Sequence, residues 1–299
     1  MTGLGQLIRR NCKLFFKDKG MFFPSLITPI ILLVLYVTFL GSVYRDSLIS
    51  AIPQEFSVDS ALIDATVAGQ LVSSLLAVCC VTVAFCSNLL MVQDRVSGAR
   101  RDLTVSPVGS ATLAAAYFTA SVLATLAVNF TALGACLVYL AAAGCWYLTA
   151  ADVILLAADV LLLTLFGVAF SSCLHVFLTT GGQASAIGTL VSAGYGFICG
   201  AYMPISSYPE GLQKVLSLLP GTYATSLLRN HALAGAFDGM ADAGLPDELI
   251  TGIRESIDCA LSLFGHSVSV GAMYAVLAGS VLLFGGVYIL INGLLRRKN

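Results

Sequence analysis

Six long apolar runs, separated by short polar segments, account for most of the 299-residue chain. They are Phe22–Tyr44, Ala65–Val92, Leu113–Tyr139, Val153–Leu174, Ala184–Met203 and Val268–Leu295. Each run has at least about the 20 residues that a helix needs to cross roughly 30 Å of hydrocarbon. A soluble protein can bury one such helix, but six of them cannot share a core of this size. The pattern therefore predicts an all-α polytopic membrane protein with six transmembrane helices.

The charged residues are few and unevenly distributed. Only 10% of residues are charged and 58% are hydrophobic, which excludes an ordinary soluble domain. Most of the 15 Lys and Arg residues precede the first span, separate spans two and three, or follow the last span. The positive-inside rule places these segments and both termini in the cytoplasm, so we expect a multi-pass protein of the cell membrane. The charged N-terminus argues against a cleavable signal peptide.

The segment before the first span has the pattern of an amphipathic helix. Over residues 4–19 apolar side chains recur at helical spacing on one face. The opposite face carries Arg9, Arg10, Lys13 and Lys17. Such a helix lies in the membrane interface with its cations towards anionic headgroups. The sequence leaves open whether this interfacial helix, within residues 1–20, is only an anchor or also a lever that contacts a cytoplasmic partner.

Residues 204–265, between the last two apolar runs, have a different character. Tyr208–Leu219 is too short to cross the membrane, and Gly221–Ala236 is a second short apolar piece. Prolines bracket these pieces, at Pro204, Pro209 and Pro220. We expect a re-entrant helical hairpin on the outer side, followed by a cap helix that begins at Pro246. An exposed outer loop is the alternative.

The sequence contains no motif for catalysis or for a metal. No lysine follows a GxxxxG element, so the chain lacks a phosphate-binding loop. The three histidines are far apart, and the nine cysteines lack zinc or iron–sulfur spacing. We therefore expect no catalytic residue and no metal. Only Cys145 and Cys259 are candidates for a non-cytoplasmic disulfide, and the sequence does not decide whether they pair.

Asp159 is the one carboxylate inside a predicted span. An acid at this depth suggests a proton or cation site. No cationic partner lies at helical spacing from it, so a structural role, such as capping a neighbouring helix, is the alternative.

The most informative polar stretch is residues 93–110, on the predicted cytoplasmic side. It is charged, ends in a Ser-Pro pair and precedes a new helix, which is more order than a plain loop needs. Its candidate functional residues are Asp94, Arg95, Gly98, Arg101, Asp102, Ser106 and Pro107.

Together with the six spans, these motifs resemble the type-2 permeases of ATP-binding-cassette exporters over nearly the whole length of the chain. The stretch from Asp94 to Val108 is similar to the family's acid-Arg-x-x-Gly…Leu-x-x-(Ser/Thr)-Pro-Val coupling segment. Gly200–Pro204, followed by Leu-Pro-Gly-Thr-Tyr at 219–223 and by Arg229, is similar to the family signature between the last two spans. One departure is Ala99-Arg100, where the family more often has Thr-Leu.

The resemblance implies one permease domain over residues 1–299 that works with a separate nucleotide-binding ATPase subunit. That subunit would carry ATP and Mg, and this chain would bind no cofactor. Residues 93–110 would couple to the ATPase. A second permease chain, identical or paralogous, is expected to contact the first and fifth spans, where Gly196 and Gly200 favour close helix approach. The expected partners are therefore the ATPase, the second permease and the lipid bilayer, without nucleic acid.

The outer hairpin is expected to form a gate. Its residues are Pro204, Pro209, Pro220, Tyr223 and Arg229. Arg229 is expected to pair with Glu210 at the mouth. The expected substrate is an amphiphile (a drug, lipid or hydrophobic peptide) carried out of the cytoplasm. The alternatives are a lipid-linked glycan exporter of the same family and a secondary transporter that uses Asp159 as an ion site.

Overall fold

The computed structural model describes residues 3–53, 56, 58–105, 109–263 and 266–298, and most of them are helical. The helices of the first half are α1 (Leu4–Lys17), α2 (Lys19–Leu35), the π-helix η1 (Tyr36–Leu40), α3 (Gly41–Ala51), α4 (Ser60–Val96), α5 (Ala99–Val105) and α6 (Ser110–Ala142). Those of the second half are α7 (Ala150–His175), α8 (Gly181–Ile198), the 3-10 helix η2 (Ile205–Ser207), α9 (Glu210–Leu216), α10 (Pro220–Asp242), α11 (Asp247–Ser256) and α12 (Val270–Lys298). One small antiparallel hairpin, β1 (Ser262–Leu263) with β2 (His266–Ser267), was not predicted.

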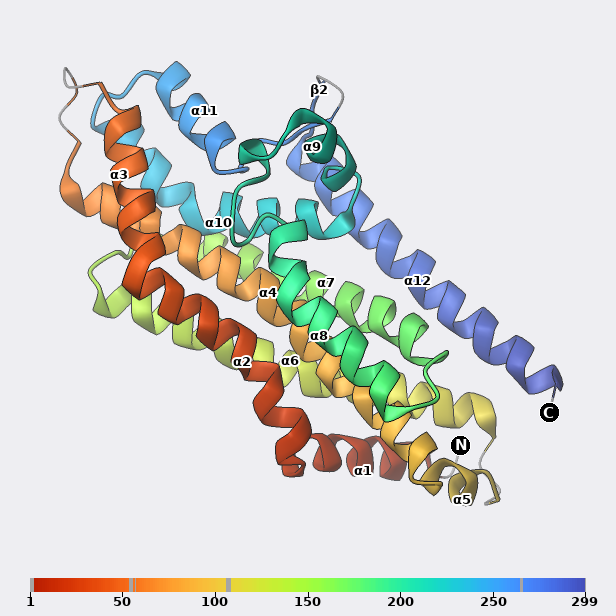
Figure 1. Ribbon diagram of the computed structural model, residues 1–299. Coiled ribbons are helices and arrows are strands. Elements are labelled where there is room, and N and C mark those ends of the chain that lie inside the picture. Colours follow the sequence, from red (N-terminus) through yellow and green to blue (C-terminus); the bar gives the residue numbers. More distant parts are fainter. Residues whose placement is uncertain (1–2, 54–55, 57, 106–108, 264–265, 299) are drawn as a thin grey trace.

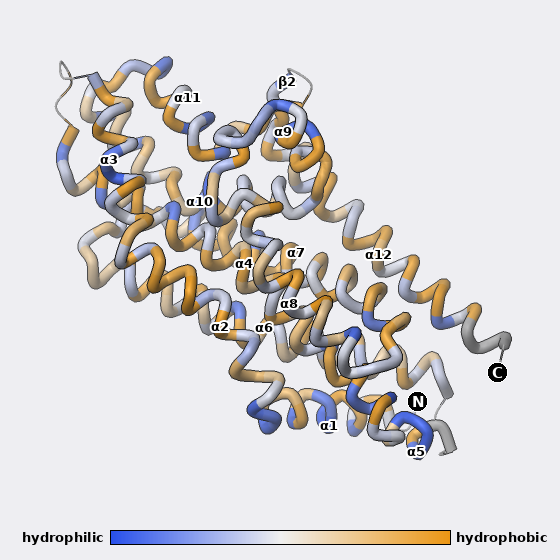
Figure 2. Tube along the Cα trace, in the orientation of Figure 1, coloured by the Kyte–Doolittle hydropathy of each residue, from blue (hydrophilic) through white to orange (hydrophobic). Residues whose placement is uncertain are grey.

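The long helices form a tilted bundle with α4 at its centre (Figure 1). Helix α4 packs against α2, α6, α7, α8 and α10, so most of its side chains are buried. Between Asp64 and Asp94 it carries no charged residue and is mostly apolar or small all round, which is typical of a helix without a solvent face. Figure 2 shows apolar residues along the middle of the bundle and more hydrophilic ones towards its two ends.

Among the described residues, five helical segments are long and apolar enough to cross a membrane. They are Lys19–Ala51, Ser60–Val96, Ser110–Ala142, Ala150–His175 and Val270–Leu294. They contain or closely match five of the six predicted spans. The remaining run, Ala184–Met203, became the glycine-rich helix α8, which has 18 residues and a length of about 27 Å. Helix α8 is not among the five segments.

The two ends of the bundle carry different elements. Helices α1 and α5 lie at one end, together with the C-terminal end of α12 (Figure 1). Helices α3, α9 and α11 and the β-hairpin lie at the other end. The charged N-terminal helix and the segment after α4 therefore share one face of the protein, as the charge pattern predicted. We call it the α1/α5 end.

Residues 204–265 contain one long helix where the sequence predicted a short piece. Helix α10 has 23 residues and extends beyond Ala236 to Asp242. It packs against α4, α7 and α12. Leu233 lies against Gly69 and Gly239 lies against Leu62, so α10 runs antiparallel to α4. The predicted cap helix is confirmed as α11, with Pro246 as its N-cap and two acids in its first turn.

Gly235 of α10 provides a test of this packing. A Cβ at this position would overlap the backbone carbonyl of Tyr147, in the turn between α6 and α7. Gly235→Ala is therefore expected to lower the free energy of unfolding by about 1–3 kcal/mol, because backbone must move. Gly134→Ala on α6, where a Cβ meets nothing within 4 Å, is the matched control. Equal thermal unfolding midpoints for the two variants would contradict the packing.

Candidate functional site

Asp94, at the α1/α5 end of α4, joins three helices. Its carboxylate is buried and accepts two hydrogen bonds from Arg10 of α1, from Nη1 to Oδ2 at 2.7 Å and from Nη2 to Oδ1 at 2.9 Å. The hydroxyl of Tyr117 on α6 donates a third, at 2.6 Å to Oδ2. A bidentate arginine–carboxylate pair fixes orientation as well as distance. The hydrogen bond to Asp94 raises the pKa of Arg10 above its ordinary value, so the arginine stays charged.

The position of Arg10 differs from the sequence-based expectation. We expected all four cations of the interfacial helix to face the headgroups, but Arg10 turns inward to Asp94. Arg9, Lys13 and Lys17 remain exposed, as predicted. The apolar pattern could not separate Arg10 from Arg9, because the distinction depends on a carboxylate 84 residues away.

Arg95 also makes contacts within the bundle. Its Nη1 donates to the carbonyl of Val176 at 3.0 Å and to that of Leu178, just after the end of α7. The last carbonyls of a helix lack partners within the helix, so the arginine satisfies part of this end. Asp94 and Arg95 thus hold α1, α6 and the α7–α8 turn to α4, and neither forms an exposed docking surface.

The short helix α5 is the exposed part of the predicted coupling segment. Gly98 precedes it with φ +83°, a conformation that favours glycine, and so reverses the chain after α4. Arg101 and Asp102 on α5 are exposed. Ser106 and Pro107 lie outside the described residues.

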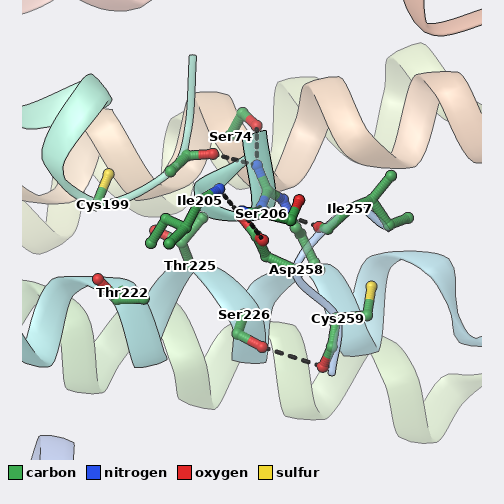
Figure 3. Close-up of polar contacts among 12 residues, drawn as sticks. Ser74, Cys199, Ile205, Ser206, Thr222, Thr225, Ser226, Ile257, Asp258 and Cys259 are labelled. Carbon is green, nitrogen blue, oxygen red and sulfur yellow. Dashed lines mark hydrogen bonds and ion pairs between the residues drawn. The ribbon is translucent and has the colours of Figure 1, made fainter. Parts of the chain in front are cut away.

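At the opposite end of the bundle, Arg229 of α10 is the centre of a second polar cluster. Its side chain is completely buried, and Nη1 contacts Asp258 Oδ2 at 3.1 Å and the carbonyl of Ile257 at 3.0 Å. Nη2 donates to the carbonyl of Gly200 and, at 3.5 Å, to Ser74 Oγ of α4. Figure 3 shows Ser74, Ile257 and Asp258 gathered around this point. One guanidinium therefore ties α4, the end of α8, α10 and the turn after α11 together.

Asp258 completes the cluster from its other side. It accepts hydrogen bonds from the backbone N–H of Ile205 at 2.6 Å and of Ser206 at 3.2 Å. Its own backbone has φ +58°, a strained conformation for a residue other than glycine. No spacing in the sequence linked Asp258 to Arg229.

The predicted pair between Arg229 and Glu210 is wrong. Glu210 is exposed and pairs with Lys214, one turn along α9, with Oε1 and Nζ 2.7 Å apart. This hydrogen bond lowers the pKa of Glu210. A pair four residues apart on one helix forms locally, whereas Arg229 is buried against α4 and the turn after α11 and finds the carboxylate of Asp258.

The other residues of the predicted gate take structural positions. Pro204 is buried beside η2, Pro209 is the N-cap of α9, and Pro220 occupies the first turn of α10. Tyr223 is 4% exposed and packs in the main hydrophobic core. The prolines therefore begin helices, where a missing N–H costs least.

Asp159, the possible intramembrane site, has partners from two other helices. It lies on α7, 1% exposed, in contact with His231 of α10 and Tyr274 of α12. Helical spacing along one span could not reveal these partners, because both come from other helices. Cys145 and Cys259 are free thiols in this structure.

An apolar groove of about 710 Å³ lies between α2 and α8, over α4. Its lining includes Pro24, Ile27, Ile31, Gly188, Ser192 and Ala193. Gly196 and Gly200, in contrast, make contacts inside this chain. The ring of Tyr202 covers Gly196, and Gly200 has φ +78° and lies just after the end of α8. The small residues of α8 that line the groove therefore precede Gly196 along the same helix.

Comparison with known proteins gives one family match. A family profile described as "ABC-2 type transporter" matches residues 2–232. The matched region runs from α1 into α10, so it contains Arg10, Asp94 and Arg229. A comparison with curated proteins gives no match.

Proposed function

This chain belongs to the ABC-2 type transporter family, and on that premise we propose that it exports an amphiphilic substrate with energy from a separate ATPase subunit. It is a multi-pass membrane protein and the permease subunit of an ABC transporter. The near absence of charged residues from the predicted spans favours an amphiphile (a drug, lipid or hydrophobic peptide) over an ion. ATP and Mg belong to the partner subunit in this proposal.

The observation that carries the coupling mechanism is the cluster around Asp94. A displacement of α5 by the ATPase moves α4 through the turn at Gly98. Asp94 transmits the motion of α4 to α1 through Arg10 and to α6 through Tyr117. Arg95 passes it to the end of α7. Helix α5 is thus the docking element, and the buried pair behind it transmits the motion.

We place the α1/α5 end in the cytoplasm, with both termini, and count α8 as the sixth crossing of the cell membrane. Helix α7 ends next to Arg95, at the α1/α5 end. Gly200, just after α8, lies beside Arg229 and Asp258, close to α11 at the other end. Helix α8 therefore has to cover the distance between the two ends, which supports a short sixth span.

The outer gate in this proposal is the unit of η2, α9 and α10, held by Arg229 and Asp258. Cysteines replacing Leu216 and Tyr223, which are 7% and 4% exposed, are expected to resist a membrane-impermeant thiol reagent. Cysteines replacing the exposed Asp242 and Asp247 are the controls and are expected to react rapidly. Burial raises the pKa of Cys259 to about 12, so this native thiol stays unreactive. Equal reaction at all four positions would exclude a packed, re-entrant hairpin.

We assign the groove between α2 and α8 to the contact with a second permease chain. Ala193→Cys, on the exposed face of α8, is expected to crosslink between copies through a short bifunctional reagent. Leu283→Cys, exposed on α12, is the control and is expected to remain monomeric. Crosslinking from α12 alone would move the contact to the other side of the bundle.

The function itself is tested by purifying the tagged chain from its native membrane. Co-purification of an ATPase and ATP-dependent export of an amphiphile from vesicles would support the proposal. Uptake of a lipid-linked glycan would select the alternative substrate. Transport driven by a proton gradient without any ATPase would replace the proposal with a secondary transporter that uses Asp159.

A further inference from the structure

A buried carboxylate, an imidazole and a phenol meet among α7, α10 and α12. Asp159 Oδ2 lies 2.6 Å from His231 Nδ1, and the hydroxyl of Tyr274 donates to Oδ1 at 2.5 Å. The rings of His231 and Tyr274 stack, with their centroids 6.3 Å apart. Both carboxylate oxygens therefore have a partner, and each partner comes from a different helix.

The charge of this cluster changes when it gains or loses one proton. With a neutral imidazole and an ionised carboxylate, the cluster carries one net negative charge. One added proton, on either group, makes it net neutral. Among the residues that the structure describes, no charged group of α4 or α6 contacts the cluster: α4 brings the Cys80 thiol, whose Sγ is 3.9 Å from the carbonyl of Val160, and α6 brings Cys136 to the same core. A net charge among apolar helices is costly, so the proton has a large effect here.

The cluster also has a route for the proton. The side chain of Asp159 is 1% exposed, whereas that of His231 keeps 11% of its surface accessible. His231 Nδ1 faces the carboxylate, and no hydrogen bond to Nε2 is found among the described residues. The imidazole thus has one nitrogen towards the buried acid and one available for exchange, which is the arrangement of a proton relay.

From this geometry we propose that Asp159 and His231 together bind one exchangeable proton. Tyr274 is a positioning residue that holds the carboxylate towards the imidazole. With the proton bound, the neutral cluster holds α10 and α12 against α7. Loss of the proton leaves a buried negative charge, so the contact weakens as the pH rises. This site is distinct from the coupling segment and from the Arg229 cluster, and it makes the outer half of the bundle sensitive to pH.

The direct test is nuclear magnetic resonance of ¹⁵N-histidine in the full chain in lipid nanodiscs. The chain has only three histidines, and His231→Gln identifies the signal of interest. We expect its ring nitrogen signals to change with pH, and Asp159→Asn to alter that change. Tyr274→Phe should alter it less, and Tyr139→Phe, at an exposed tyrosine, should not. A His231 signal that does not titrate, or that ignores Asp159→Asn, would overturn the proposal.

A second measurement does not depend on the single variants being well behaved. The double variant Asp159→Asn with His231→Gln keeps polar groups at both positions and removes the titration. The thermal unfolding midpoint of the wild type is expected to fall more steeply with rising pH than that of the double variant. The control, His266→Gln at an exposed histidine, should keep the wild-type slope. Equal slopes for the wild type and the double variant would show that the cluster binds no proton in the pH range measured.

Discussion

Replacing Arg229 with methionine is expected to lower the free energy of unfolding by about 3–5 kcal/mol, the largest effect of any single substitution proposed for this chain. The guanidinium is fully buried and bonded to Asp258, two backbone carbonyls and Ser74. Without it the carboxylate of Asp258 is left buried without its counter-ion. The thermal unfolding midpoint and the yield of monodisperse protein in detergent measure the loss.

Two further variants test whether the loss of stability comes from the buried Arg229–Asp258 pair and not from the removal of any arginine. Arg45→Met breaks the pair with Asp64, whose side chains are 41% and 45% exposed, and is expected to cost no more than about 1 kcal/mol. Adding Asp258→Asn to Arg229→Met should recover part of the stability, since the uncompensated charge is removed. Similar losses from Arg229→Met and Arg45→Met would contradict the assignment of a buried hub.

Asp94→Asn is expected to uncouple transport from ATP hydrolysis and to lower the free energy of unfolding by about 1.5–3 kcal/mol. The amide keeps the shape of the carboxylate but cannot accept both hydrogen bonds of Arg10. The relation between α1, α4 and α6 is then no longer fixed. Substrate exported per ATP hydrolysed, measured in vesicles that contain the complete transporter, reports this coupling.

Neighbouring arginines on α1 supply the controls for this prediction. Arg10→Gln should reproduce the effect of Asp94→Asn, and the double variant should add little because the two substitutions break one interaction. Arg9→Gln, at the exposed neighbour, is expected to change stability by less than about 0.5 kcal/mol. If Arg9→Gln and Arg10→Gln behave alike, α1 acts only through its overall charge.

The spans and the interfacial helix could be predicted because hydropathy is a local property. The apolar run Ala65–Val92, for example, required only its own composition to be recognised as the centre of α4. The polar pairs could not be predicted, because they join residues far apart in the sequence. Asp94 and Arg10 are separated by 84 positions, and Asp159 and His231 by 72.

The length of α10 could not be predicted from hydropathy alone. The apolar run Gly221–Ala236 suggested a short piece, but the helix continues to Asp242. In the structure Gly235 lies against the backbone of Tyr147, and Gly239 lies against Leu62. These two glycines allow the last turns of α10 to pack inside the bundle.

The order of the polar partners along the chain has a consequence for biosynthesis. Synthesis proceeds from the N-terminus, so Asp159 enters the membrane before His231 and Tyr274 exist, and Arg229 is made before Asp258. Until Asp258 and α12 have been made, a nascent permease exposes first a carboxylate and then also a guanidinium without their final partners. Unfinished chains therefore carry unpartnered charges that a membrane protease or chaperone can recognise. Insertion of α12 brings Tyr274, which is the last of the missing partners.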